Sequence, residues 1–334
     1  MLYFSFMKDF PPFFSHNSII SHILEIGDIM SIVPTNLNYT SVLLRQNLAS
    51  LNRAYPFLNI QVIGNSVLGR PIHAIRLGNG PKKVFYSAAY HANEWITSVV
   101  LMKFIEDFCE AYKQNSSIYG IRARQIFKDT SIFLVPMVNP DGVDLVTGLF
   151  TYENSELFHF EQIARQYPSI PFPSGWKANY NGVDLNLQFP ARWDRAKEIK
   201  FSQGFTSPAP RDFVGFGPLT EPESLAVYNF TLNHEFRLIL AYHTQGEVIY
   251  WRFADYMPKE AEAIGKRFAA SSGYTLEETP IASSYAGYKD WFIQTYNRPG
   301  YTIEAGLGEN PLPISQFDQI YQENLGILVL GATL

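Results

Sequence analysis

One short apolar segment runs directly into two metal-ligating residue types and then into a helix. Residues 84–89 are mostly apolar, His91 and Glu94 follow them, and a helical pattern of apolar positions begins near Ile96. A strand that passes at once into a helix can bring an imidazole and a carboxylate to one point above the sheet edge. The His-x-x-Glu spacing therefore predicts part of a metal site, and it predicts a strand followed by a helix at the centre of the fold.

A third ligand is expected at the end of another strand, because catalytic zinc sites combine three protein ligands with one open position. Residues 237–243 form an apolar run that ends in His243. His91, Glu94 and His243 have the two-histidine, one-carboxylate composition of zinc hydrolase sites. We therefore predict one Zn²⁺ ion per chain, although Co²⁺ or Mn²⁺ could occupy the same ligands. A further run, residues 301–304, ends in Glu304 and brings a second carboxylate to a strand end.

Strand and helix patterns alternate along most of the chain. The continuous apolar run 131–138 is typical of a strand buried on both faces. Thr40 or Ser41 is available as an N-cap, and Thr220-x-x-Glu223 matches a capping box. We predict an α/β domain whose mixed, mostly parallel central sheet has helices on both faces. The patterns predict helices over residues 40–51, 96–112, 220–234, 259–271 and 313–330, and strands over 59–66, 71–77, 83–89, 131–138, 237–243, 247–251 and 301–304.

Length and composition fit one large catalytic domain. The chain has 334 residues, of which 46% are hydrophobic, enough for a substantial core. We expect the catalytic domain to span residues 36–334 and residues 1–35, which show no clear period, to be an N-terminal extension or linker. Residues 143–218 are rich in Pro, Gly and aromatic residues with little periodicity. Because such a long irregular span is unusual unless it is functional, we expect it to build the walls of a pocket.

Charge and hydropathy argue against several partners. The net charge is −5 and no long run of Lys and Arg is present, so we expect no nucleic-acid partner. No apolar stretch reaches the roughly 18 residues of a membrane span. Lys8 and Asp9 interrupt the aromatic amino-terminal segment, and we do not expect a signal peptide. The single cysteine, Cys109, is expected to be a small buried residue, and no pattern indicates an oligomeric state.

The motifs, taken in order, resemble those of the zinc carboxypeptidase family, M14, over roughly residues 40–334. The resemblance implies a metallopeptidase in which His91, Glu94 and His243 are the zinc ligands. It also implies that Glu304 takes a proton from the metal-activated water and delivers it to the leaving nitrogen. The matching segments are His91-Ala92-Asn93-Glu94, Asn139-Pro140-Asp141-Gly142, Trp176-Lys177-Ala178-Asn179, Gly182-Val183-Asp184-Leu185-Asn186, His243 and Tyr301-Thr302-Ile303-Glu304.

Two positions depart from the pattern of the family. Lys177 stands where the family usually places an arginine that stabilises the oxyanion, so the charge is kept while the planar fork is lost. Asn186 matches an asparagine that helps to hold the terminal carboxylate of the substrate. Its neighbour is Leu187, where the exopeptidases of the family have arginine. Without that guanidinium the bidentate clamp on a C-terminal carboxylate is missing, which argues against an ordinary carboxypeptidase.

Residues 182–190, 242–246 and 283–291 resemble one branch of the family, the bacterial γ-D-glutamyl-L-diamino acid endopeptidases. These enzymes cut the bond between γ-D-glutamate and diaminopimelate in cell-wall peptides. The resemblance implies that a peptidoglycan stem peptide, or a fragment of one, is the substrate. It leaves two locations open, the bacterial cytoplasm, where a role in sporulation is one option, and the cell wall.

The same resemblance suggests further substrate-binding residues. Lys289 aligns with the position that sets specificity in the family, and a base there suits an acidic group. Tyr285 and Tyr288 both lie in the loop that carries the mobile active-site tyrosine of the family, and Tyr285 is the candidate. One alternative is a carboxypeptidase of ordinary C-terminal specificity that uses Lys177 or Lys289 in place of the clamp. A non-enzyme alternative is a cell-wall peptide-binding module, which would require loss of zinc or of Glu304.

Overall fold

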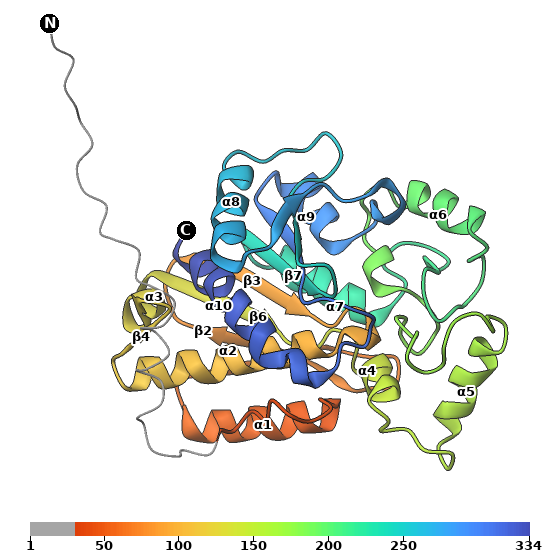
Figure 1. The fold of residues 1–334 in the computed structure, drawn as a ribbon, viewed down its shortest axis with the longest axis horizontal. Helices are drawn as coiled ribbons and strands as arrows, with labels where there is room; N and C mark the ends of the chain where they lie inside the picture. The colour runs from red at the N-terminus through yellow and green to blue at the C-terminus, as the bar shows by residue number, and fades with distance from the viewer. Residues whose placement is uncertain (1–30) are drawn as a thin grey trace, which may run out of the picture. The chain divides into compact units, whose positions relative to one another are not determined.

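An eight-stranded mixed sheet forms the centre of the fold in the computed structural model, which describes residues 31–334 (Figure 1). The strand order is β1-β2-β6-β3-β7-β10-β8-β9. A separate two-stranded sheet pairs β4 (Ser117–Ile118) with β5 (Ile121–Arg122). The strands of the large sheet are β1 (Asn59–Asn65), β2 (Pro71–Leu77), β3 (Lys82–Ala88), β6 (Thr130–Val135), β7 (Leu238–His243), β8 (Val248–Tyr250), β9 (Thr275–Glu277) and β10 (Gly300–Glu304).

Four neighbouring strands, β6, β3, β7 and β10, run parallel to one another. Their carboxyl ends therefore lie along one edge of the sheet. Ala88 of β3 pairs with Tyr242 of β7, and His243 of β7 pairs with Glu304 of β10. This register places the polar ends of three strands side by side, which is the arrangement that ligand sites of open α/β sheets use.

Helices cover both faces of the sheet, as predicted (Figure 1). On one face, Tyr86 of β3 donates its hydroxyl proton to the carbonyl of Leu328 in α10, at 2.9 Å. On the other face, the ring of Phe85 packs against Phe230 of α7 and Tyr288 of α9. The α-helices are α1 (Ser41–Ala54), α2 (Ile96–Lys113), α3 (Ala123–Asp129), α4 (Pro140–Val146), α5 (Ser155–Ala164), α6 (Trp193–Ser202), α7 (Pro222–Leu232), α8 (Ala261–Ser272), α9 (Tyr288–Tyr296) and α10 (Phe317–Thr333).

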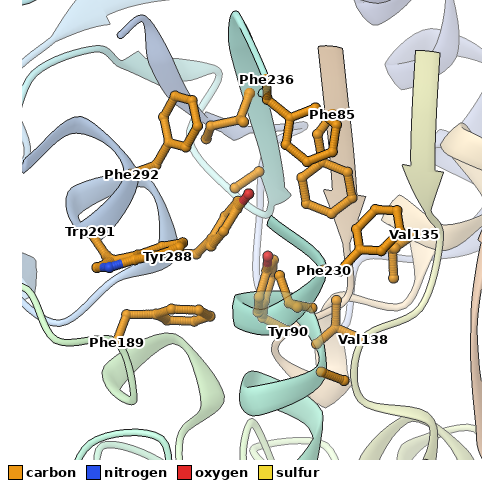
Figure 2. Packing of buried hydrophobic residues seen from close by; sticks show 14 of the residues in the cluster. Phe85, Tyr90, Val135, Val138, Phe189, Phe230, Phe236, Tyr288, Trp291 and Phe292 are labelled. Carbon is orange, nitrogen blue, oxygen red and sulfur yellow. The ribbon is translucent and has the colours of Figure 1, made fainter. Parts of the chain in front are cut away.

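An aromatic cluster fills the space between the sheet and helices α7 and α9 (Figure 2). Tyr288 stacks on Tyr90 with ring centroids 5.9 Å apart, and Phe189 and Trp291 pack beside them. Tyr90 also stacks on His243, 5.7 Å away. Because close-packed aromatic rings resist displacement, this cluster fixes the floor beneath the strand ends.

Several expectations about local structure are resolved by the structure. Thr40 is the N-cap of α1 and accepts a hydrogen bond from the amide of Leu43. The capping box expected at Thr220 is wrong: Glu221 occupies the N-cap position of α7, while the Thr220 hydroxyl contacts the side-chain oxygen of Gln188. Residues 143–218 also contain two helices, α5 and α6, that the sequence did not predict.

The remaining predictions from the sequence concern the amino-terminal extension, the cysteine and membrane spans. The extension assigned to residues 1–35 lies almost entirely outside the described residues, and its boundary stays a prediction. Val33–Leu334 form one compact unit. Cys109 is fully buried, as expected. In the described part of the chain, no helix combines the length and apolar character needed to cross a membrane.

Candidate metal centre

Two strand ends deliver the three predicted metal-binding side chains to one place. His91 lies just beyond β3 and precedes a short 3₁₀ helix, η2 (Ala92–Glu94), so that His91 and Glu94 face the same point. His243 is the last residue of β7, the neighbour of β3. A backbone hydrogen bond fixes the turn after β3, because the amide of Ala92 donates to the carbonyl of Lys177 at 3.0 Å.

The ligand atoms of His91, Glu94 and His243 lie within 4.8 Å of one another. Nδ1 of His91 and Nδ1 of His243 are 3.3 Å apart. The Glu94 carboxylate lies 2.9 Å from the first nitrogen and 2.8 Å from the second. In a tetrahedral site with zinc–nitrogen bonds of about 2.0–2.1 Å, two nitrogen ligands are separated by about 3.3 Å. The donor set and its spacing therefore fit a zinc ion held by these three residues.

Asp184 orients the first of these histidines. Its Oδ1 lies 3.0 Å from Nε2 of His91, and its Oδ2 accepts from the amide of Asp212 at 3.2 Å. A carboxylate on Nε2 holds the proton on that nitrogen and leaves Nδ1 to face Glu94 and His243. The sequence motif contained Asp184, but no role was assigned to it. A ligating histidine generally needs an acceptor on its second ring nitrogen, and this need is the signal that could have identified Asp184.

Charges at this centre shift the protonation of its members. Burial opposes protonation of His91, but the carboxylates of Glu94 and Asp184 outweigh burial and raise the pKa of His91 to about 9. Burial alone would raise the pKa of Glu94, but the charges of His91 and Lys177 hold it well below the usual range. The pKa of Asp184 is likewise lowered, because His91 outweighs the effect of burial. The carboxylates are therefore ionised at neutral pH.

Glu304 and Lys177 flank the three ligand residues. Glu304 is the last residue of β10, beside His243, and its carboxylate has no hydrogen-bond or ion-pair partner within residues 31–334. Burial raises the pKa of Glu304, against the opposing charge of His243. Nζ of Lys177 donates to Oε1 of Glu94 at 3.0 Å. Glu94 outweighs the effect of burial and raises the pKa of Lys177, which keeps the ammonium charged.

A cleft with a volume of about 560 Å³ opens over these residues. Its size suits a peptide segment or another small ligand. The irregular segment that was expected to build the pocket walls does so, since Ser174, Lys177, Asp184 and Asn186 all line the cleft.

Asn186 lies on the wall of this cleft. Its Oδ1 accepts a hydrogen bond from the amide of Tyr288, and its own amide donates to Asp184 at 3.1 Å. Its side-chain Nδ2 has no partner among the described residues, so this donor is available to a ligand. Its neighbour Leu187 is buried in a small apolar cluster.

Lys289 and Tyr285 are placed differently from one another. Lys289 lines the cleft but is only 4% exposed and forms an ion pair with Asp290 at 2.7 Å. Tyr285 is not among the lining residues; its ring packs edge-on against Phe253, with centroids 6.0 Å apart. Tyr288, the other candidate, is fully buried and hydrogen-bonded to Thr231. A tyrosine from this loop reaches the cleft only if the loop moves, and the role of Tyr285 stays a prediction.

Comparisons with known proteins agree with this geometry. The family model described as zinc carboxypeptidase matches residues 44–326. The chain is 47% identical over 297 residues to γ-D-glutamyl-L-diamino acid endopeptidase 1 of Lysinibacillus sphaericus, which covers 89% of this chain and 73% of the relative.

Solved structures share the fold at low sequence identity. Carboxypeptidase A from Helicoverpa armigera matches with a TM-score of 0.66 at 18% identity, over 90% of this chain and 74% of that one. Bovine thrombin-activatable fibrinolysis inhibitor, solved with a tick carboxypeptidase inhibitor, matches with a TM-score of 0.67 at 16% identity, over 90% and 97%. The solved structures confirm the predicted fold. The family model and the relative confirm the metallopeptidase class, and with the ligand cluster they confirm the zinc cofactor. This chain belongs to the zinc carboxypeptidase family and is a metallopeptidase.

Proposed function

We propose that this metallopeptidase hydrolyses the amide bond between the γ-carboxyl of a D-glutamyl residue and a diamino acid in peptidoglycan stem peptides. The observation that carries the proposal is the cleft wall beside Asn186. Leu187 packs with Ala196, Val214 and Ala286, and by the sequence resemblance it stands where the exopeptidases of the family have the arginine of the carboxylate clamp. The activity named for the relative from Lysinibacillus sphaericus, at 47% identity, agrees with a substrate other than an ordinary carboxyl-terminal residue.

His91, Glu94 and His243 would hold the zinc ion. When bound, zinc supplies a Lewis acid that polarises the scissile carbonyl and lowers the pKa of a water molecule. Asp184 keeps a proton on Nε2 of His91, so that the imidazole presents its other nitrogen to the site.

Glu304 acts as the general base and then as the general acid. Its unpaired carboxylate, with a raised pKa, accepts a proton from water and passes it to the leaving nitrogen. Lys177 balances the negative charge that develops on the carbonyl oxygen. Its ammonium lines the cleft 3.0 Å from the ligand carboxylate Glu94 and keeps two donors without a partner among residues 31–334. Nδ2 of Asn186 donates to the substrate and orients it.

The test is hydrolysis of L-Ala-γ-D-Glu-meso-diaminopimelate by the purified zinc-loaded protein, followed by release of diaminopimelate and L-Ala-D-Glu. Glu304→Gln keeps the shape of the side chain and removes the base. We expect cleavage by the parent and a loss of at least about 1,000-fold in kcat in the variant, with one zinc ion retained in each.

Two results would contradict the proposal. One is a parent protein that carries zinc but leaves this peptide intact while cleaving hippuryl-type carboxypeptidase substrates, which would indicate ordinary C-terminal specificity. The other is binding of the peptide without turnover by the zinc-loaded parent, which would indicate a cell-wall peptide-binding module.

A further inference from the structure

Four lysine and arginine side chains line the cleft, and they differ in how many of their hydrogen-bond donors are used and in how exposed they are. A cation can bind a substrate carboxylate strongly only when its donors face the cleft and are not already held by protein acceptors. The four are Lys177, Lys200, Arg211 and Lys289.

Two of the lysines are held by carboxylates. Lys177 donates to Glu94 at 3.0 Å, next to the metal-binding residues. Lys200, on α6, is 9% exposed and donates to Oδ1 of Asp212 at 2.5 Å. Each ammonium is therefore tied to the wall of the cleft through one of its three donors, and the two side chains are only 16% and 11% exposed.

The third lysine, Lys289, is held more completely. It is buried against Asp290, and its Nζ also donates to the carbonyl of Arg252 at 2.8 Å and contacts Oγ1 of Thr279 at 3.3 Å. Two of the three donors of this ammonium are used in these hydrogen bonds, and its charge is balanced by the ion pair with Asp290.

Arg211 differs from the three lysines in exposure and in the shape of its charged group. Its Nε donates to Oδ2 of Asp212 at 2.7 Å, and its side chain is 41% exposed. Its two terminal nitrogens have no hydrogen-bond or ion-pair partner in the described part of the chain. A guanidinium held through Nε still presents its terminal nitrogens as a planar fork, which matches the two oxygens of a carboxylate.

The backbone fixes Arg211 beside the reacting groups. The carbonyl of Pro210 accepts hydrogen bonds from the amides of Lys177 and Ala178, at 2.7 and 2.9 Å. On its other side, the amide of Asp212 donates to Asp184, the carboxylate that orients His91. Arg211 and Lys177 therefore stand on adjacent segments of one cleft wall, anchored to the same centre.

We propose that Arg211 binds the free α-carboxylate of the D-glutamyl residue of the substrate. This inference rests on the proposed function, since only a γ-linked glutamyl residue carries a free α-carboxylate near the scissile carbonyl. Two carbons, Cα and Cβ, lie between the carboxylate carbon and Cγ, which is the carbon next to the scissile carbonyl. A cation beside Lys177 is therefore within reach of the α-carboxylate. An α-linked residue with a neutral side chain has no carboxylate at that place. Arg211 thus selects for a glutamyl residue over neutral residues on this side of the scissile bond.

The test compares two peptides that differ only at this group, L-Ala-γ-D-Glu-meso-diaminopimelate and its D-glutamyl α-amide. The variants are Arg211→Gln, Arg211→Lys and, as a matched control, Arg165→Gln at the exposed C-terminal end of α5. We expect Arg211→Gln to lower kcat/KM for the carboxylate peptide about 10- to 100-fold, because a charge-assisted pair is lost. For this peptide, kcat/KM of Arg211→Lys should fall between that of the parent and that of Arg211→Gln. Arg165→Gln should leave kcat/KM unchanged for both peptides.

On the α-amide peptide, kcat/KM of the parent and of Arg211→Gln should agree within about threefold. Calorimetric binding to the inactive Glu304→Gln background should show the same difference in Kd. Equal losses on both peptides, or no loss on either, would overturn the role of Arg211 while leaving the proposed function intact. If the zinc-loaded parent cleaves neither peptide, the proposed function fails and this inference fails with it.

Discussion

The buried ion pair between Lys289 and Asp290 offers a test of how the cleft is held together. Lys289→Met removes the ammonium and keeps much of the volume of the side chain. Lys289 and Asp290 are only 4% and 5% exposed at the side chain. In the described residues, Asp290 has no other ionic partner and no hydrogen bond to its side chain.

Removing one member of such a pair leaves a buried charge without compensation, which typically costs about 3–5 kcal/mol. Lys289→Met should therefore lower the free energy of unfolding by about that amount. The double variant Lys289→Met/Asp290→Asn removes both charges and should lose only about 1–2 kcal/mol, through lost hydrogen bonds and packing. The coupling free energy between the two sites should then be at least about 2 kcal/mol.

Urea denaturation of the zinc-loaded proteins at neutral pH measures these differences, provided that the m-value stays constant. The matched control is Lys266→Met, whose ion pair with Glu262 is exposed and should be worth less than about 0.5 kcal/mol. A cost below about 1 kcal/mol for Lys289→Met, or a double variant as unstable as the single one, would refute the reasoning.

The same variants test the predicted contact of Lys289 with substrate. Because the ammonium of Lys289 is already held within the protein by the ion pair with Asp290 and two hydrogen bonds, we expect the double variant to keep KM within about threefold of the parent. A large rise in KM in a double variant of restored stability would instead show that Lys289 binds the substrate directly.

Three further predictions concern the metal centre. Asp184→Asn should weaken zinc binding about 10- to 100-fold, measured by competition with a chelator, because the acceptor that orients His91 loses its charge; an unchanged affinity would contradict this. His91 has a pKa raised to about 9, so it is protonated at pH 7 and must release that proton to bind zinc. The affinity for zinc should therefore rise about tenfold per pH unit between pH 7 and 9. Calorimetric heats of zinc binding that do not depend on the ionisation enthalpy of the buffer would argue against this proton release. Gly142→Ala should cost about 1–3 kcal/mol in urea denaturation, because its Cβ would lie 2.6 Å from the carbonyl of Ala178 and 2.7 Å from Cβ of Ala92; a neutral substitution would contradict this packing.

The sequence predicted the centre of the fold well because there pattern and structure coincide. Buried strands are short apolar runs, and the residue that ends each run projects at the sheet edge. His243 and Glu304 were found in this way, and His91 and Glu94 were found from the turn that follows β3. Thr40 was found because an N-cap is a local interaction that depends on few residues.

Helices without a clear apolar stripe were missed. Helix α6 buries only Ala196 and Lys200, so no helical period of apolar residues exists. Helix α9 buries every residue from 288 to 293, and continuous burial has no period either. Thr220 misled the capping prediction because its hydroxyl contacts Gln188, which is distant in sequence.

The roles of Asp184 and Arg211 depend on neighbours that come from distant parts of the chain. Asp184 acts through His91. Arg211 is distinguished from the lysines of the cleft by its greater exposure. Sequence patterns describe local periodicity, whereas these roles follow from which donors remain unused after the chain has folded.

The position of β10 within the sheet bears on the order in which the protein matures during synthesis. This strand is translated after every other strand of the large sheet, yet it lies between β7 and β8. Until it emerges from the ribosome, β7 presents an unpaired edge beside His243, and the base Glu304 is absent. A nascent chain therefore passes through a stage with an open, aggregation-prone edge and all three metal ligands already made, and hydrolytic competence arrives only with the last strand.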